Sequence, residues 1–188
     1  MATRFRQHSL ATAPVASQSA LQDIERGLGF VPNLFATLAE SPVTLDGYLA
    51  LDAILAKGSF TAAERQILAT AVSSANGCTY CTAAHSTLAG RLRAPGDAIT
   101  AARGEGAAAD AALAALVHFT HAVVRTRGHI ESEELEMFLA AGFTPAQALE
   151  VVAHVGLKTI SNYIDGFAHV PLDAAFQDNR WRPVAAAA

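Results

Sequence analysis

The chain has 188 residues, of which 52 % are hydrophobic and 16 % are charged, and its formal net charge is −4. A chain of this length can bury a full core as one domain, and the slightly acidic balance without a basic stripe argues against a nucleic-acid partner. Because no apolar run approaches the roughly 20 residues that a membrane-spanning helix needs, we also expect no membrane partner.

Alanine is the commonest residue of the chain. It is the best helix former, and runs that alternate β-branched or aromatic residues with polar ones are scarce, so we expect an all-α protein with close helix contacts. The expected helices span residues 19–27, 33–40, 42–58, 61–76, 78–91, 96–104, 107–126, 132–141 and 145–167. Residues 1–18 are expected to form an extended N-terminal arm, 19–177 one helical domain and 178–188 a C-terminal tail.

Two of these helices begin with a capping pattern. Thr61 is followed three residues later by Glu64, and Thr144 is followed by Gln147, with Pro145 at the first helical position. In such a capping box, each side chain satisfies a backbone N–H that the start of a helix leaves unpaired. The two boxes therefore predict helix starts at Thr61 and Thr144.

The only two cysteines lie in the run Asn76-Gly77-Cys78-Thr79-Tyr80-Cys81-Thr82-Ala83-Ala84-His85. Asn-Gly is a helix-break signal, so the next helix is expected to start at Cys78. Positions i, i+3 and i+7 of a helix share one face, so Cys78, Cys81 and His85 should lie side by side. The chain shows no secretory signal, so we expect the reducing cytosol, where such a pair is more often catalytic or metal-binding than a structural disulfide.

The thiolate is the nucleophile of cysteine chemistry, so the pKa of one cysteine must be lowered. The helix dipole favours Cys78, whereas His85, one turn further on, favours Cys81. Because the histidine also gives a route for the proton, we assign Cys81 as the attacking thiol and Cys78 as the resolving thiol. The pattern then predicts peroxide reduction, in which Cys81 becomes a sulfenic acid, Cys78 condenses with it to a disulfide, and an external dithiol restores the pair.

Two alternatives stay open for this pair of cysteines. Both side chains can be small hydrophobic residues of the core. They can also form half of a zinc site, which would need histidine ligands such as His121, His154 or His169, because the chain has no second cysteine pair.

The segment from Thr61 to Ser86, with its Asn-Gly-Cys-x-x-Cys-x-x-x-His signature, resembles the alkylhydroperoxidase D-like branch of the carboxymuconolactone decarboxylase family. The run 157–164 and residues 171–173 are similar to the C-terminal part of peroxidase-related members. The resemblance implies an all-helical fold, a homo-oligomer, no cofactor, and thiol-dependent reduction of a small hydroperoxide. It also implies that Cys81 is the peroxidatic cysteine, Cys78 the resolving one and His85 the general base.

The chain departs from the family pattern at two positions. Gln66 stands where the family usually has a proton-relay glutamate, and a glutamine can orient His85 but cannot accept a proton. Glu64 is the nearest acid and the remaining relay candidate, although two residues are about 200° around a helix and its capping box gives it another role. Tyr80 stands where well-studied members have a histidine. A decarboxylase or lactone-processing enzyme, or a non-catalytic redox-sensing or metal-binding protein, are the alternative functions.

Overall fold

The computed structural model describes residues 5–183, and within this range the chain forms nine α-helices, one 3₁₀-helix and no strand. The elements are α1 (Val15–Leu28), α2 (Asn33–Leu38), α3 (Pro42–Leu55), α4 (Ala62–Ala75), α5 (Thr79–Arg91), α6 (Gly96–Ala102), α7 (Ala111–Thr126), α8 (Ser132–Ala140), α9 (Pro145–Ala168) and η1 (Ala174–Asn179). The all-α fold class expected from the composition is confirmed.

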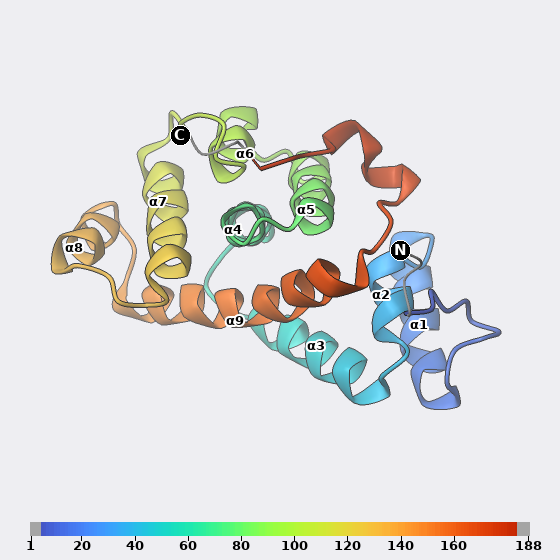
Figure 1. Cartoon of the computed structure of the whole chain (residues 1–188). Coiled ribbons are helices and arrows are strands. Elements are labelled where there is room, and N and C mark those ends of the chain that lie inside the picture. The colour runs from blue at the N-terminus through green and yellow to red at the C-terminus, as the bar shows by residue number, and fades with distance from the viewer. Residues whose placement is uncertain (1–4, 184–188) are drawn as a thin grey trace.

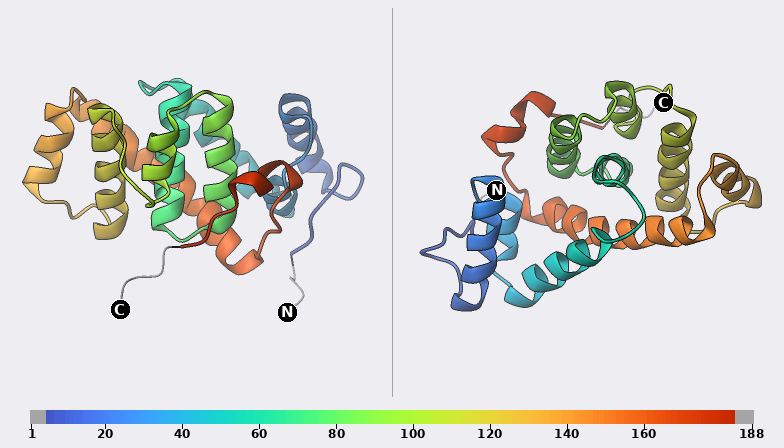
Figure 2. Two further views of the ribbon diagram at one scale, coloured as in Figure 1. Left: turned by 90° about the horizontal axis from the view of Figure 1, so that it is seen from above. Right: turned by 180° about the vertical axis from the view of Figure 1, so that it is seen from behind.

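Helix α4 lies at the centre of the molecule, where Figure 1 shows it end-on. It packs against α5, α6, α7 and α9. The long helix α9 runs along one side of this group and reaches the first helices of the chain, where it contacts α2 and α3 (Figure 1). Both views in Figure 2 show the same order, with α8 at one end of the molecule and α1 at the other. The cysteine helix α5 is thus held between α4, α9 and the C-terminal segment.

Small side chains allow the central helices to lie close together. Ala71 of α4, Ala89 of α5 and Ala98 and Ala102 of α6 are all 0 % exposed and form one cluster. Interiors are packed as densely as organic crystals, so a methyl group at each of these positions sets a short distance between helix axes. The close helix contacts expected from the alanine content are present.

Both expected capping boxes are present. The Glu64 carboxylate accepts a hydrogen bond from Thr61 N at 2.7 Å, and Thr61 Oγ1 accepts one from Glu64 N at 3.2 Å. Thr144 and Gln147 make the same reciprocal pair at the start of α9. The two patterns therefore located the starts of α4 and α9 correctly.

Two other helix starts differ from the expectation. Helix α1 begins at Val15, inside the stretch expected to be an extended arm. Helix α7 begins at Ala111 instead of near 107, because Asp110 Oδ1 accepts from Leu113 N at 2.9 Å and so caps the helix. The alanines before Asp110 have no side chain that can pair with the first backbone N–H groups, so the helix starts where a cap is available.

The segment after α9 folds back onto the domain. The 3₁₀-helix η1, which no sequence pattern indicated, contributes Phe176 to the core, and Trp181 is only 4 % exposed. The first part of the expected C-terminal tail is thus docked on the domain, whereas residues 1–4 of the arm and 184–188 of the tail lie outside the described residues.

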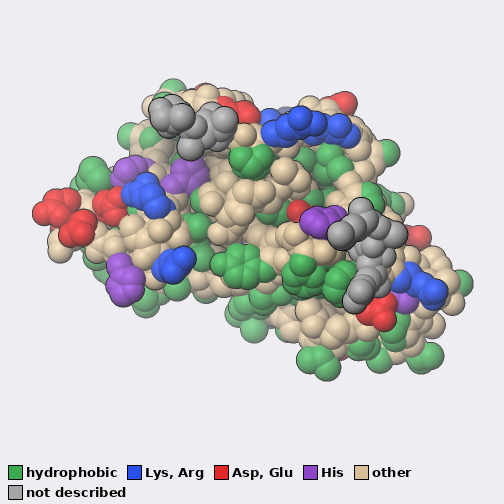
Figure 3. Space-filling view, viewed as in Figure 1, with side chains coloured by type: hydrophobic (Ala, Val, Ile, Leu, Met, Phe, Trp, Pro, Cys, Tyr) green, Lys and Arg blue, Asp and Glu red, His purple; other side chains and the backbone are tan. Residues whose placement is uncertain are grey.

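Charged side chains gather at the surface. Figure 3 shows acidic side chains over α8, whose first turn carries Glu133 and Glu134.

Among residues 5–183, no single helix has both the length and the apolar character to cross a membrane. Only α8 and α9 together satisfy these two criteria as a pair, and they are bent by 113° relative to each other.

Candidate active site

The turn between α4 and α5 places the two cysteines. Gly77 has a φ of 70°, a left-handed conformation that glycine adopts without a Cβ clash, and Cys78 N donates to the carbonyl of Ser73 at 2.9 Å. Cys78 then becomes the N-cap of α5, and its Sγ accepts from Cys81 N at 3.2 Å. Both cysteines are free thiols, buried at the start of this helix.

Helix α9 presents a buried polar stripe to the cysteines, and each sulfur has its own partner there. Cys78 Sγ donates to Asp165 Oδ2 at 3.2 Å. Cys81 Sγ lies 3.7 Å from Ser161 Oγ, which can donate to the sulfur once Cys81 is ionised. Asp165 is held in place because its Oδ1 accepts from Val170 N at 3.1 Å.

These contacts give the two thiols different protonation states. When the single S–H of Cys78 turns from Asp165 to Cys81, its hydrogen bond, the positive charge of Lys158 and the hydrogen bond with Ser161 together outweigh burial and lower the pKa of Cys81 to about 6. The hydrogen bond to Cys81, burial and the negative charges of Cys81 and Asp165 raise the pKa of Cys78. At neutral pH, these shifts favour a thiolate at Cys81 and a thiol at Cys78.

The cation that stabilises this thiolate is Lys158, which is 1 % exposed. Its Nζ donates to the Tyr48 hydroxyl at 3.1 Å. Burial opposes the charge of Lys158, but the oxygen of Tyr48 and the sulfurs of the two cysteines outweigh it and hold its pKa above the ordinary value. An ammonium group is almost never buried without such partners.

His85 is held by Gln66. The Nδ1 of His85 lies 2.8 Å from Gln66 Oε1, and because a carbonyl oxygen can only accept, Nδ1 must carry the proton. Burial and the charge of Lys158 hold the pKa of His85 well below its ordinary value, so the ring is neutral and Nε2 has a free lone pair. The orienting role expected for Gln66 therefore has its contact in the structure.

Cys81 and His85 line one cavity of about 210 Å³, to which α3 contributes Tyr48 and Asp52. The rest of its wall is mostly apolar and comes largely from the first two helices and the loop that joins them. The apolar lining residues are Leu28, Phe30, Pro32, Leu34, Phe35, Ala84, Leu88 and Phe176. The cavity suits a small ligand with an apolar body and one reactive polar group.

Two further residues singled out in the sequence have structural contacts. Glu64 closes its capping box and does not line the Cys81 cavity. The Tyr80 hydroxyl donates to Asp173 Oδ2 at 2.5 Å and accepts from Leu34 N at 3.3 Å, so this side chain ties α5 to α2 and to the C-terminal segment. Tyr80 thus links these segments beside the Cys81 cavity.

The histidines considered as zinc ligands lie apart from one another. His154 packs edge-on to Phe60 at 6.2 Å, whereas His121 Nε2 lies 3.3 Å from Ser74 Oγ. His169 lines a second cavity, which also contains Cys78. Within residues 5–183, no group of three or more His, Cys, Asp or Glu side chains could hold a metal ion.

Sequence patterns did not indicate Lys158, Ser161, Asp165 or Tyr48. The first three follow one another on α9 with i, i+3, i+7 spacing, the same spacing as that of the cysteines and histidine on α5, and this shared spacing is the signal that could have found them. Tyr48 carries no such signal, because only tertiary packing brings α3 to α9.

Residues 42–125 match the model of the carboxymuconolactone decarboxylase family. This part of the chain is thus similar to that family. The match covers α3 to α7, and so includes both cysteines and His85. No curated protein matches the sequence.

Solved structures share the fold over nearly the whole chain. One is an uncharacterized peroxidase-related protein with an alkylhydroperoxidase AhpD core from Ralstonia eutropha JMP134 (TM-score 0.83, 23 % identity, covering 94 % of this chain and 95 % of that one). Another is an uncharacterized peroxidase-related protein from Silicibacter sp. TM1040 (TM-score 0.78, 21 % identity, 93 % and 95 %). A third is a cysteine-to-alanine variant of the debrominase Bmp8 in complex with 2,3,4-tribromopyrrole (TM-score 0.80, 21 % identity, 95 % and 96 %). The fold is therefore that of the alkylhydroperoxidase D-like proteins.

Proposed function

We propose that the protein is a thiol-dependent peroxidase that reduces organic hydroperoxides through Cys78 and Cys81. The observation that carries this proposal is the Cys81 thiolate in an apolar cavity, with neutral His85 in the same cavity and the protonated thiol of Cys78 beside it. Dithiol peroxide reduction needs a thiolate, a proton carrier and a resolving thiol. The match of residues 42–125 to the family model and the likeness to peroxidase-related proteins support the same chemistry.

In the oxidative step, Cys81 Sγ attacks the terminal oxygen of the hydroperoxide. An S–O bond forms, the O–O bond breaks, and the product is a sulfenic acid together with the alcohol. Because Cys81 is already ionised, the leaving alkoxide takes its proton from the solvent, and Nε2 of His85, which the hydrogen bond from Nδ1 to Gln66 keeps unprotonated, relays this proton.

In the resolving step, Cys78 Sγ attacks the sulfur of the Cys81 sulfenic acid. An S–S bond forms, and the hydroxyl group leaves as water after it takes a proton. An external dithiol then reduces the disulfide by two thiol–disulfide exchanges. The cytosol supplies such reductants, so the cytosolic location expected from the sequence is part of this proposal. Homo-oligomeric assembly stays a prediction.

Steady-state peroxide consumption with dithiothreitol as reductant tests the proposal. The apolar wall predicts that kcat/KM for cumene hydroperoxide exceeds that for hydrogen peroxide by at least about tenfold, because burial of a phenyl-sized group contributes roughly 1.5–3 kcal/mol. A protein that consumes neither peroxide would rule out the proposed function, and equal rates for the two peroxides would rule out the role of the apolar wall.

Gln66 gives a second test of the same site. In a Gln66→Leu variant, Nδ1 of His85 loses its acceptor, so we expect kcat/KM for cumene hydroperoxide to fall by roughly 10²-fold, the scale of catalysis by a positioned acid or base. A Gln66→Glu variant keeps an acceptor for Nδ1 and should retain the wild-type rate or exceed it. A wild-type rate in the leucine variant would show that Gln66 does not position the imidazole.

A second candidate function is the reductive dehalogenation of a small halogenated aromatic compound. It is favoured by the aromatic side chains in the wall of the Cys81 cavity and by the likeness to debrominase Bmp8. Cys81 would take up the halogen as an S–X bond while the carbon gains a proton, and Cys78 would then displace halide as the disulfide forms. Bromide release from 2,3,4-tribromopyrrole, in proportion to the dithiol oxidised, would support this function.

The remaining alternatives make different demands on the cysteines. Decarboxylation or lactone processing needs no thiol pair. In such an enzyme, the thiolate of Cys81 and the neighbouring thiol of Cys78 would have no role. A redox sensor would form the disulfide without turnover. Multiple turnovers of peroxide per protein molecule distinguish the peroxidase from the sensor.

A further inference from the structure

We propose that the external dithiol reaches the disulfide through a second cavity at Cys78, on a different side from the cavity that the peroxide enters. In this second cavity, Asp165 accepts and returns the proton of the Cys78 thiol. This inference rests on the proposed dithiol chemistry and adds to it the entry route of the reductant and a further catalytic residue.

The two sulfurs of the pair belong to different cavities. Cys81 lines the apolar cavity of about 210 Å³, whereas Cys78 lines a cavity of about 350 Å³ between the α4–α5 turn and the C-terminal end of α9. No residue lines both cavities. A disulfide between Cys78 and Cys81 would thus present one sulfur atom to each cavity.

The second cavity has a different chemical character from the first. Its lining is mostly polar, and it includes Asn76, Thr79, Asn162, Asp165 and His169. A hydroperoxide with an apolar body suits the Cys81 cavity, whereas a hydrophilic dithiol suits the Cys78 cavity. The volume of the second cavity lies in the range of small-molecule sites.

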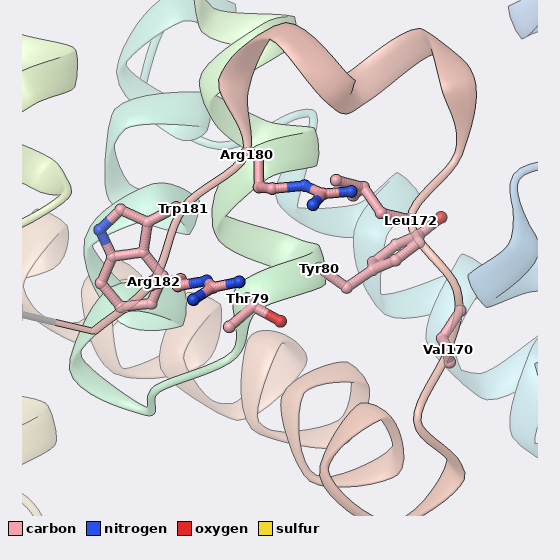
Figure 4. Close-up of a pocket in the computed structure, with 7 residues that line it drawn as sticks. All are labelled: Thr79, Tyr80, Val170, Leu172, Arg180, Trp181 and Arg182. Atoms are coloured by element: carbon pink, nitrogen blue, oxygen red, sulfur yellow. The ribbon is translucent and has the colours of Figure 1, made fainter.

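Basic side chains lie beside this second cavity. Figure 4 shows a neighbouring hollow in which Arg182 of the C-terminal segment lies beside Thr79 at the start of α5, whereas Arg180 extends toward Leu172. Thr79 and Val170 line both this hollow and the Cys78 cavity, so the two are adjacent. The attacking form of a reductant is a thiolate anion, and positive charge near its entry raises its local concentration.

Asp165 is placed to carry the proton of Cys78. Its Oδ2 accepts from Cys78 Sγ at 3.2 Å, and its Oδ1 is held by Val170 N, so the carboxylate faces the sulfur in a fixed orientation. When Cys78 attacks the sulfenic acid, its proton passes to Oδ2. The same carboxyl group can return a proton to Cys78 when the reductant releases this sulfur.

The reductive half-reaction then balances as follows. The thiolate of the dithiol attacks Cys78 Sγ, the protein disulfide breaks, and Cys81 leaves as the thiolate that Lys158 stabilises. The second thiol of the reductant, deprotonated as it attacks, closes the oxidised reductant and releases Cys78, which regains a proton from Asp165. Two electrons pass from the dithiol to the protein, and both starting thiol states are restored.

A side chain at Gly166 tests the route, because Gly166 lines the Cys78 cavity and an added Cβ meets no atom within 4 Å. We expect a Gly166→Leu variant to fold, since leucine is the better helix former, and to fill part of the cavity. Gly156→Leu is the matched control, an exposed glycine of the same helix that also has free space and lies outside both cavities. The disulfide is formed with diamide, and its reduction by dithiothreitol is followed by thiol titration.

Reduction is expected to be severalfold slower in the Gly166→Leu variant than in the wild type and in the Gly156→Leu control, with unchanged oxidation by cumene hydroperoxide. Equal reduction rates in all three proteins would overturn the proposed route. Diamide forms the disulfide without peroxide, so this test of the route does not depend on the proposed function. If the wild type forms and loses the disulfide but consumes no peroxide, the proposed function is wrong, and the route can still be judged.

An Asp165→Asn variant tests the proton carrier, because asparagine keeps the shape and the acceptor for Val170 N but cannot take up a proton. We expect the sulfenic acid to form at the wild-type rate and the disulfide to form about 10²-fold more slowly at neutral pH. Asp173→Asn, another buried carboxylate that accepts from a backbone N–H, is the control and should not change the ratio of the two rates. An unchanged ratio in the Asp165 variant would overturn the role of Asp165.

Discussion

Replacement of Cys81 by serine is expected to reduce kcat/KM for cumene hydroperoxide by at least about 10³-fold, because loss of the nucleophile removes the covalent path altogether. A serine hydroxyl is not ionised near neutral pH, so Lys158 has no thiolate to stabilise. The measurement is peroxide consumption with dithiothreitol as reductant, and circular dichroism of the variant confirms the helical fold.

Cys78→Ser is the matched variant and should behave differently. It keeps the attacking thiol, so one equivalent of peroxide is still reduced, and the sulfenic acid on Cys81 then accumulates because no resolving thiol remains. Mass spectrometry after trapping with dimedone would detect this species. A Cys81→Ser variant with full activity, or a Cys78→Ser variant that forms no sulfenic acid, would contradict the assigned roles.

Replacement of Lys158 by methionine is expected to have the second-largest effect. Loss of a neighbouring opposite charge shifts a pKa by 1–3 units, so the pKa of Cys81 should rise from about 6 toward 8, and the thiolate fraction at pH 7 should fall about tenfold. Because the thiolate is the deprotonated form, the wild-type rate rises as the pH passes through about 6 and then levels off. The rate of the variant should continue to rise above pH 7.

The pH profile distinguishes an electrostatic role of Lys158 from a purely structural one. Lys57→Met is the control, because Lys57 is the only other lysine and is exposed, and it should leave the profile unchanged. Methionine fills a volume similar to that of lysine, and Cys81 can take up a proton in the variant, so no unpaired thiolate has to stay buried. A Lys158→Met variant with the wild-type profile would show that another group sets the pKa of Cys81.

The sequence was sufficient for the fold class and for the helices with strong local signals. The capping boxes at Thr61 and Thr144 predicted helix starts because the pairing groups lie three residues apart in the chain. The start of α7 was misplaced because helix propensity favoured the alanines, whereas the cap at Asp110 decided the boundary. η1 carried no local signal, and its position depends on contacts between Phe176 and the core.

The candidate site could be predicted only where it is local in sequence. Cys78, Cys81 and His85 share one helix, and their spacing predicted one site, whereas the structure places Cys81 and His85 in one cavity and Cys78 in another. The contact between His85 and Gln66 followed from the family resemblance, since these residues belong to neighbouring helices. The partners that set the two thiol states, Lys158 and Asp165, are separated from the cysteines by 77 and 87 residues (158 − 81 and 165 − 78), and only the packing of α9 on α5 brings them together.

The cap of α5 has a consequence for the rigidity of the whole molecule. The sulfur atom of Cys78 caps the start of α5, and it also links this helix to α9 through its hydrogen bond to Asp165. Formation of the disulfide transfers this proton to Asp165, which then faces a sulfur that is only a weak acceptor, so the contact between the two helices weakens while a covalent bond forms between Cys78 and Cys81. The oxidised protein is therefore expected to be less rigid than the reduced protein where α5 meets α9. Each catalytic cycle would then weaken this contact and restore it.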